Sequence, residues 1–132
     1  LHLPSDQFVV MGSAILQLKG IRDADDIDII VARDLFDQLK SSSDWEYKVE
    51  WGEVGGGMEV ECLDNNDGIT LYPYIYGGGE VDYFLSDPEH IETIDGIHFA
   101  SLENLLKVKG TSWDRPKDLK DAELIKAYLD SR

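Results

Sequence analysis

The sequence reads FVVMGS at residues 8–13, AILQLKG at 14–20 and DIDIIV at 26–31. The first apolar run ends in Gly12 and Ser13, which predicts a strand that turns directly into a short helix. The third segment predicts a second strand that carries Asp26 and Asp28 at its start. This strand–helix–strand order at the beginning of the chain predicts an α/β or α+β fold.

Asp26 and Asp28 occupy alternate positions of the second predicted strand and therefore point to the same face, roughly 6.5 Å apart along the strand. Ile27, Ile29 and Val31 form the opposite face, which we expect to be buried. Two carboxylates this close repel each other unless a cation lies between them, and Mg²⁺ prefers carboxylate oxygen. The pair therefore predicts a magnesium site; the alternative is an acidic loop solvated at the edge of the sheet.

The Gly12-Ser13 turn has the residue types of a phosphate site. Glycine lets the backbone approach a phosphate, and the N-terminus of the following helix supplies unpaired N–H groups. The Ser13 hydroxyl can add a hydrogen bond. The alternative is an ordinary strand-to-helix turn in which Ser13 caps the helix.

This arrangement resembles the nucleotidyltransferase superfamily, which shares the fold of DNA polymerase beta. The family signature is an apolar residue, Gly, then Gly or Ser, a helix-sized gap and an Asp-apolar-Asp strand, matched here by Met11, Gly12, Ser13 and residues 26–28. The segments LLKVK at 105–109 and RPKDLKD at 115–121 resemble the ends of small bacterial members, including antibiotic-modifying and toxin–antitoxin types. The likeness spans most of the chain.

The resemblance implies Mg²⁺-dependent transfer of a nucleoside monophosphate from an NTP, with ATP expected, to an acceptor hydroxyl, with release of pyrophosphate. It implies catalytic and metal-binding roles for Asp26, Asp28 and a third carboxylate on a neighbouring strand. We assign the third carboxylate to Asp82, because it interrupts an apolar run that alternates like a strand. Glu59 and Glu61, which show the same alternation on an earlier strand, are the rivals.

Three cations near the C-terminus are candidate ligands of the triphosphate: Lys109, Arg115 and Lys117. Arginine suits bidentate contact with phosphate, and lysine acts as a point charge. Arg22 is a further candidate of the same kind. The alternative is that these charges are solvated at helix ends, with Lys117 and Asp121 forming a surface pair one helical turn apart.

The charge, hydropathy and cysteine content of the chain limit the classes of partner that we expect it to bind. The formal net charge of −15 argues against broad contact with nucleic acid, and it favours a cationic small molecule as acceptor over tRNA or protein. No run is long and apolar enough to span a bilayer. Cys62 is the single cysteine, which excludes an internal disulfide. We therefore expect a cytoplasmic protein without a membrane partner.

The chain is expected to form one nucleotidyltransferase-like domain over residues 1–132, and its start without Met suggests that residues precede Leu1. A short helix from Arg33 is expected to be followed by an antiparallel meander with strands at 45–51, 58–63, 69–76 and 80–85. Further helices are predicted from Ser86, from Ser101 and from 114 or 116 to Leu129. The helices should pack mainly on one side of the sheet.

Two functions without catalysis remain open at this point. The domain could bind nucleotide but perform no chemistry, as a regulatory or antitoxin-like partner module. It could also be an acidic protein-interaction domain whose aspartates keep it soluble.

Overall fold

The computed structural model describes residues 4, 6–11, 14–21, 23, 27–52, 58–65, 67–74, 80–108 and 116–131. Within these ranges, only the backbone is described at residues 50–52, 58–60, 107, 108, 117 and 118.

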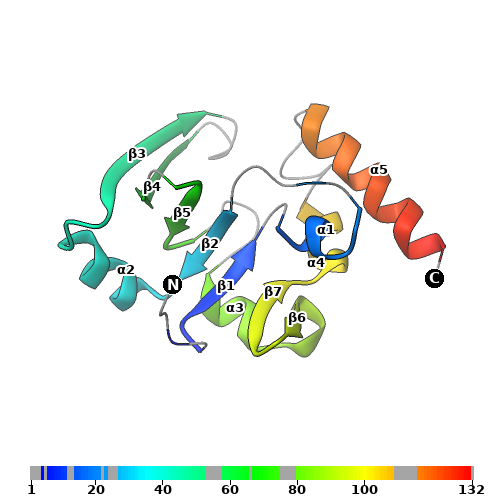
Figure 1. Ribbon diagram of the computed structural model, residues 1–132, viewed down its shortest axis with the longest axis horizontal. Helices are drawn as coiled ribbons and strands as arrows, with labels where there is room; N and C mark the ends of the chain where they lie inside the picture. Colours follow the sequence, from blue (N-terminus) through cyan, green and yellow to red (C-terminus); the bar gives the residue numbers. More distant parts are fainter. Residues whose placement is uncertain are drawn as a thin grey trace.

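The described residues form one mixed seven-stranded sheet with five α-helices and one 3₁₀-helix (Figure 1). The strands are β1 Phe8–Met11, β2 Ile27–Val31, β3 Glu46–Gly52, β4 Met58–Asp64, β5 Ile69–Tyr72, β6 Ile91–Ile94 and β7 Ile97–Ala100. The helices are α1 Ala14–Leu18, α2 Arg33–Lys40, α3 Val81–Leu85, η1 Pro88–His90, α4 Leu102–Val108 and α5 Pro116–Asp130. No helix in the described ranges is long and apolar enough to cross a membrane.

The strand order is β3-β4-β5-β2-β1-β7-β6. β1 pairs antiparallel with β2 and parallel with β7, and β2 pairs parallel with β5. The outer pairs β3–β4, β4–β5 and β6–β7 are antiparallel. This mixed sheet with helices confirms the predicted α/β class, and the meander is confirmed for its first three strands.

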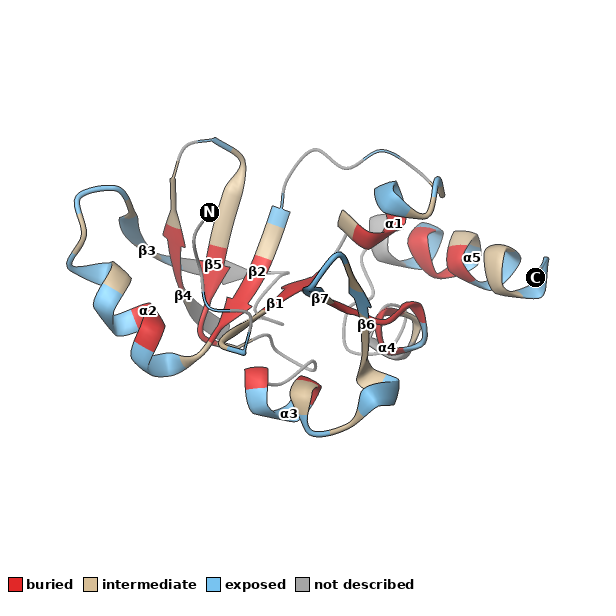
Figure 2. Cartoon of the chain, turned by 60° about the horizontal axis from the view of Figure 1, so that its bottom comes forward, coloured by how far each residue is buried: buried red, intermediate tan, exposed pale blue. Residues whose placement is uncertain are grey.

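The core lies on both faces of the central strands, and Figure 2 shows buried residues concentrated there and on the inward faces of the helices. On β2, Ile29 and Val31 are buried as predicted, but Ile27 is 39 % exposed and Ile30 is fully buried. The strand is therefore covered on both faces toward its end and open at its start. Asp28 lies at this open start.

The predicted strand at 80–85 is wrong, because these residues form helix α3. Val81 and Phe84 are buried while Asp82 and Tyr83 are exposed, which is the spacing of a helix rather than of a strand. The short run VDYFL is compatible with both periods, so alternation alone could not decide between them. β5 is also shorter than predicted and ends at Tyr72, before the proline that cannot donate to the ladder.

The helix predicted from Ser86 is only the single turn η1. Its cap is Asp87, whose Oδ1 accepts the Glu89 N–H at 2.9 Å, while the Ser86 hydroxyl donates to the carbonyl oxygen of Tyr83. The β6–β7 hairpin that follows is absent from the sequence prediction. Its signal was present, because Asp95 and Gly96 both have positive φ (52° and 79°), as an Asp-Gly hairpin turn requires.

The two C-terminal helices are confirmed. Ser101 caps α4, since its hydroxyl oxygen accepts the Asn104 N–H at 3.1 Å. In α5, Ala122 and Ile125 are buried as their spacing predicts, whereas Leu119 is 48 % exposed instead of facing the core.

Candidate functional site

The candidate site lies where β1 ends and β2 begins. In the antiparallel pair, Met11 lies directly opposite Asp28. Of the sequence signature, the structure describes Met11, Ile27 and Asp28, and the register places Met11 and Asp28 side by side. In Figure 1 the end of β1 and the start of β2 lie near the middle of the molecule, and α5 begins above them at the upper right.

A row of polar residues crosses the sheet from Asp28. Thr70 on β5 lies opposite Asp28, and Asp64 on β4 lies opposite Thr70. Residues that pair directly share a face, so all three lie on the same face of the sheet, with Asp28 and Asp64 about 10 Å apart between their Cα atoms. All three side chains are partly exposed. Sequence reasoning missed Asp64, although it ends a strand at the same edge as Asp28.

Asp64 is held by a cation. Lys48 Nζ lies 3.0 Å from Asp64 Oδ2 and 3.8 Å from Glu46 Oε2. The hydrogen bond from Lys48 to Asp64, followed by the charges of Asp64 and Glu46, raises the pKa of Lys48. The ammonium group of Lys48 therefore lies beside Asp64, at the outer end of the row of polar residues formed by Asp28, Thr70 and Asp64.

Asp82 lies beyond the other end of β2. With Ala32 and Arg33 it lines a cleft of about 220 Å³ that follows the last residue of the strand. Ala32 is four residue steps along the chain from Asp28, which corresponds to about 13 Å. The structure therefore does not bring Asp82 beside Asp28, and its place in α3 removes the strand alternation on which its assignment depended.

Glu61, one of the rivals, lies on the wrong face of the sheet. On β4 it shares a face with Leu63, which pairs with Leu71, whereas Asp64 shares the face of Asp28. Its carboxylate accepts hydrogen bonds from Arg33 at 3.1 Å and from the Tyr47 hydroxyl at 3.2 Å. Glu61 is therefore part of a surface ion pair between α2 and the sheet.

These contacts change the ionisation of Glu61. Partial burial raises its pKa, but the hydrogen bond and charge of Arg33 and the hydrogen bond of Tyr47 outweigh that effect, so the pKa of Glu61 lies below its ordinary value of 4.5. A carboxyl group with a lowered pKa in the folded state stabilises the protein above its unfolded pKa, and this stabilisation is lost as pH falls through the folded pKa.

We therefore expect Glu61→Gln to destabilise the protein at neutral pH by less than about 1 kcal/mol, because the pair is partly exposed. The difference from wild type should begin to shrink as pH falls below 4.5 and should vanish only below the lowered pKa of Glu61 in the folded protein, where its carboxyl group is protonated in both states. Urea unfolding of both proteins at several pH values measures this. A difference that is constant over the whole range would contradict the ion-pair explanation.

Several predicted residues lie outside the described part of the chain: Gly12, Ser13, Arg22, Asp26, Lys109 and Arg115. The same holds for the side chains of Glu59 and Lys117. Lys117 lies in the first turn of α5, and Asp121, one turn later, is buried with 2 % of its surface exposed.

Among the described residues, no group of three His, Cys, Asp or Glu side chains is placed to hold a metal ion. Comparison of the chain with protein-family models, with curated proteins and with solved structures finds no match. An assignment of function therefore depends on the residues and their arrangement.

Proposed function

We propose that this chain is a nucleotidyltransferase-like domain that binds an NTP with Mg²⁺ and transfers its nucleoside monophosphate to an acceptor hydroxyl. The observation that carries the proposal is the pairing of Met11 with Asp28. It places Met11, which precedes Gly12 and Ser13 in the sequence, beside Asp28 of the Asp-Ile-Asp segment, and Asp28 is partly exposed at the start of β2.

The roles follow from the chemistry of the side chains. Asp28 and Asp26 supply carboxylate oxygens, which suit Mg²⁺, and the ion supplies charge neutralisation for the phosphates. Gly12 and Ser13 bind phosphate through backbone N–H groups and the hydroxyl. Lys117, in the first turn of α5, is a candidate for the phosphates as well, as are Lys109 and Arg115.

In the proposed reaction the acceptor oxygen forms a bond to the α-phosphorus of the NTP, and the bond from that phosphorus to pyrophosphate breaks. The hydroxyl proton leaves to water or to a carboxylate. The domain itself contributes position and electrostatics rather than covalent chemistry. The net charge of −15 favours a cationic small molecule as the acceptor.

One observation favours a second function, Mg²⁺-dependent nucleotide binding without transfer, as in a regulatory or antitoxin-like module. The residue opposite Asp28 on the adjacent parallel strand β5 is Thr70, not a carboxylate. A third carboxylate on a neighbouring strand is what the resemblance leads us to expect for transfer. The nearest described carboxylate in this row, Asp64, lies one strand further away.

The first test is thermal unfolding of the wild type with Mg²⁺ and each of the four NTPs. Ligand at 100 times its dissociation constant should stabilise the folded state by about 2.7 kcal/mol, and the shift should disappear with EDTA. Absence of a shift with every NTP would contradict both nucleotide proposals and would favour an acidic interaction domain. A shift without pyrophosphate release in the presence of hydroxylated amines would favour the binding module.

A further inference from the structure

Strand β3 forms one outer edge of the sheet. In the strand order it pairs with β4 alone, and Figure 1 shows it along the outer left side of the molecule, with no other described strand beyond it. On the outer side of an edge strand, a row of backbone N–H and C=O groups has no partner within the sheet. A further strand that pairs with β3 would satisfy these groups.

The usual means of preventing such pairing are not used by β3. The strand has seven residues, and its pairing with β4 runs without a bulge from Glu46 opposite Asp64 to Gly52 opposite Met58. Its sequence, EYKVEWG, contains no proline. Short edge strands, bulges and proline are the common protection against strand addition. The backbone of β3 therefore offers its whole length to a partner strand.

Side chains on both faces of β3 are accessible to such a partner. Val49 is 50 % exposed and Tyr47 is 39 % exposed, and the two share one face because they occupy alternate positions. The Tyr47 hydroxyl donates to Glu61 at 3.2 Å, which fixes its ring beside the edge. On the other face, the Lys48 side chain is 40 % exposed although it binds Asp64.

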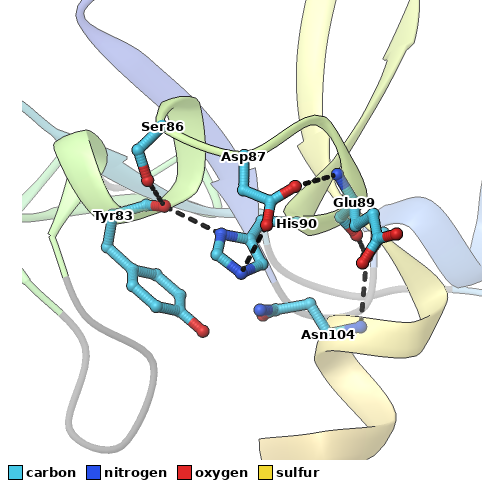
Figure 3. Close-up of polar contacts among 7 residues, drawn as sticks. Tyr83, Ser86, Asp87, Glu89, His90 and Asn104 are labelled. Carbon is cyan, nitrogen blue, oxygen red and sulfur yellow. Dashed lines mark hydrogen bonds and ion pairs between the residues drawn. The ribbon is translucent and has the colours of Figure 1, made fainter.

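The opposite edge of the sheet is less suited to pairing. Strand β6 has only four residues, and Glu92 in it forms an ion pair with α1. The strand follows directly on η1, which is tied to its neighbours on two sides. His90 Nδ1 donates to the Tyr83 carbonyl oxygen at 2.8 Å, and Ser101 Oγ donates to the Glu89 carbonyl oxygen at 2.9 Å (Figure 3).

The charges of β3 select one register in which two copies of the strand can pair. Around a two-fold axis, antiparallel strands place residues of the same face opposite each other. A register centred on Lys48 opposes two lysines, and one centred on Tyr47 overlaps only three strand residues. A register centred on Val49 matches all seven residues and places each Lys48 opposite residue 50 of the other copy, which is a glutamate.

We propose that β3 binds the β3 strand of a second copy of this chain, antiparallel and centred on Val49, so that the two sheets continue into one. Two Lys48–Glu50 pairs related by the two-fold axis supply charge complementarity, and the exposed Val49 side chains meet at the centre. A single strand pair is a small interface, so the dimer is weak and transient. The net charge of −15 on each copy opposes association until salt screens it.

This interface is separate from the proposed nucleotide site. Strands β4 and β5 lie between β3 and β2, so three strand spacings, roughly 14 Å, separate the β3 backbone from Asp28. The inference does not depend on the proposed transferase, and it can be tested without nucleotide or Mg²⁺.

The test is sedimentation equilibrium of the whole chain from about 10 µM to about 1 mM protein at about 0.15 M salt, where the Debye length is about 8 Å. We expect a monomer–dimer equilibrium. Val49→Lys should raise its dissociation constant about fivefold or more, because it opposes two lysines at the centre of the interface. Ile97→Lys makes the same kind of change at a 39 % exposed position on β7 and should leave the constant unchanged.

A charge exchange tests the register itself. Glu50→Lys places a lysine opposite Lys48 of the other copy, so it should also raise the dissociation constant about fivefold or more. The double variant Lys48→Glu/Glu50→Lys restores opposite charges across the axis and should dimerise about fivefold more tightly than Glu50→Lys alone. Urea unfolding at about 10 µM protein verifies that each variant folds, and Glu50→Lys keeps the test valid even if Val49→Lys does not fold.

Amide hydrogen exchange locates the interface within the chain. Residues 46–52 should exchange more slowly at about 1 mM protein than at about 10 µM, whereas residues 91–94 of β6 should exchange equally at both concentrations. A monomer at every concentration would overturn the proposal. So would equal dissociation constants for Val49→Lys and Ile97→Lys, no recovery in the double variant, or concentration-dependent protection of β6 instead of β3.

Discussion

Replacement of both Asp26 and Asp28 by asparagine is expected to abolish the Mg²⁺-dependent stabilisation of this protein by an NTP. Asparagine keeps the size of the side chain but removes the negative charge that makes the site attractive to a hard cation. In wild type, saturating nucleotide should raise the free energy of unfolding by about 2.7 kcal/mol, or roughly 10 °C in melting temperature for a domain of this size. The double variant should show no shift with Mg²⁺ and nucleotide together.

If the chain is a transferase, pyrophosphate release should fall by about 10³-fold or more in the same variant. Metal ions contribute several kcal/mol to the stabilisation of transition-state charge, and each 1.36 kcal/mol changes the rate tenfold. Pyrophosphate production with a panel of hydroxylated amines, assayed at equal protein concentration, measures this loss. The thermal shift and the rate are separate readouts, so loss of binding can be distinguished from loss of chemistry.

Two single variants serve as controls. Asp44→Asn makes the same change in an exposed turn before β3 and should keep the full thermal shift. Asp82→Asn should also keep it, because Asp82 lies in α3 beyond the far end of β2. Loss of the nucleotide effect in Asp82→Asn would contradict this placement and restore Asp82 as the third carboxylate. Retention of the full effect in the Asp26→Asn/Asp28→Asn variant would exclude the proposed site.

Ile125→Ala in helix α5 is expected to destabilise the protein by about 2–5 kcal/mol, because Ile125 is fully buried and its truncation leaves a cavity. Leu119→Ala in the same helix should change the free energy of unfolding by less than about 0.5 kcal/mol, since Leu119 is 48 % exposed. Urea unfolding measures both, with an unchanged m-value as the sign that the two-state transition is preserved.

This pair also tests the orientation of α5, because the two residues share one face in the sequence prediction. If both substitutions lowered the free energy of unfolding by the same amount, Leu119 would face the core and the helix would be rotated relative to the described structure. A large cost at Leu119 alone would place the buried stripe on the other side of the helix. Either result would contradict the burial of α5 described above.

The sequence predicted secondary structure best where one spacing of apolar residues, that of a helix or that of a strand, continued over a whole segment. The first two strands, the α2 helix, the β3–β4–β5 meander and the α5 helix were all predicted, because their apolar spacing or glycine-rich breaks favour one structure. It failed between residues 80 and 100, where short runs such as VDYFL are compatible with strand and helix alike. The β6–β7 hairpin was missed although its Asp95-Gly96 turn was readable.

For the candidate site, too, one part can be predicted from the sequence and another part depends on the tertiary structure. Residue types and spacing predict a metal site at Asp26 and Asp28 beside the Gly-Ser turn, because two aspartates on one face of a strand repel each other unless a cation lies between them. This site stays a prediction. Tertiary register alone shows that Thr70 stands opposite Asp28, that Asp64 shares its face, and that Glu61 does not. Strand order depends on pairing between segments far apart in the chain, which local periodicity does not encode.

The sequence by itself determined the mixed α/β class, most of the elements and the acidic strand start, since these depend on local spacing and residue chemistry. Only the tertiary structure decided which carboxylates share a face, that Asp82 lies on a helix, and that β3 forms an outer edge of the sheet. Such features arise when elements distant in sequence pack together, because burial and the loss of hydrogen-bond partners are properties of the packed chain.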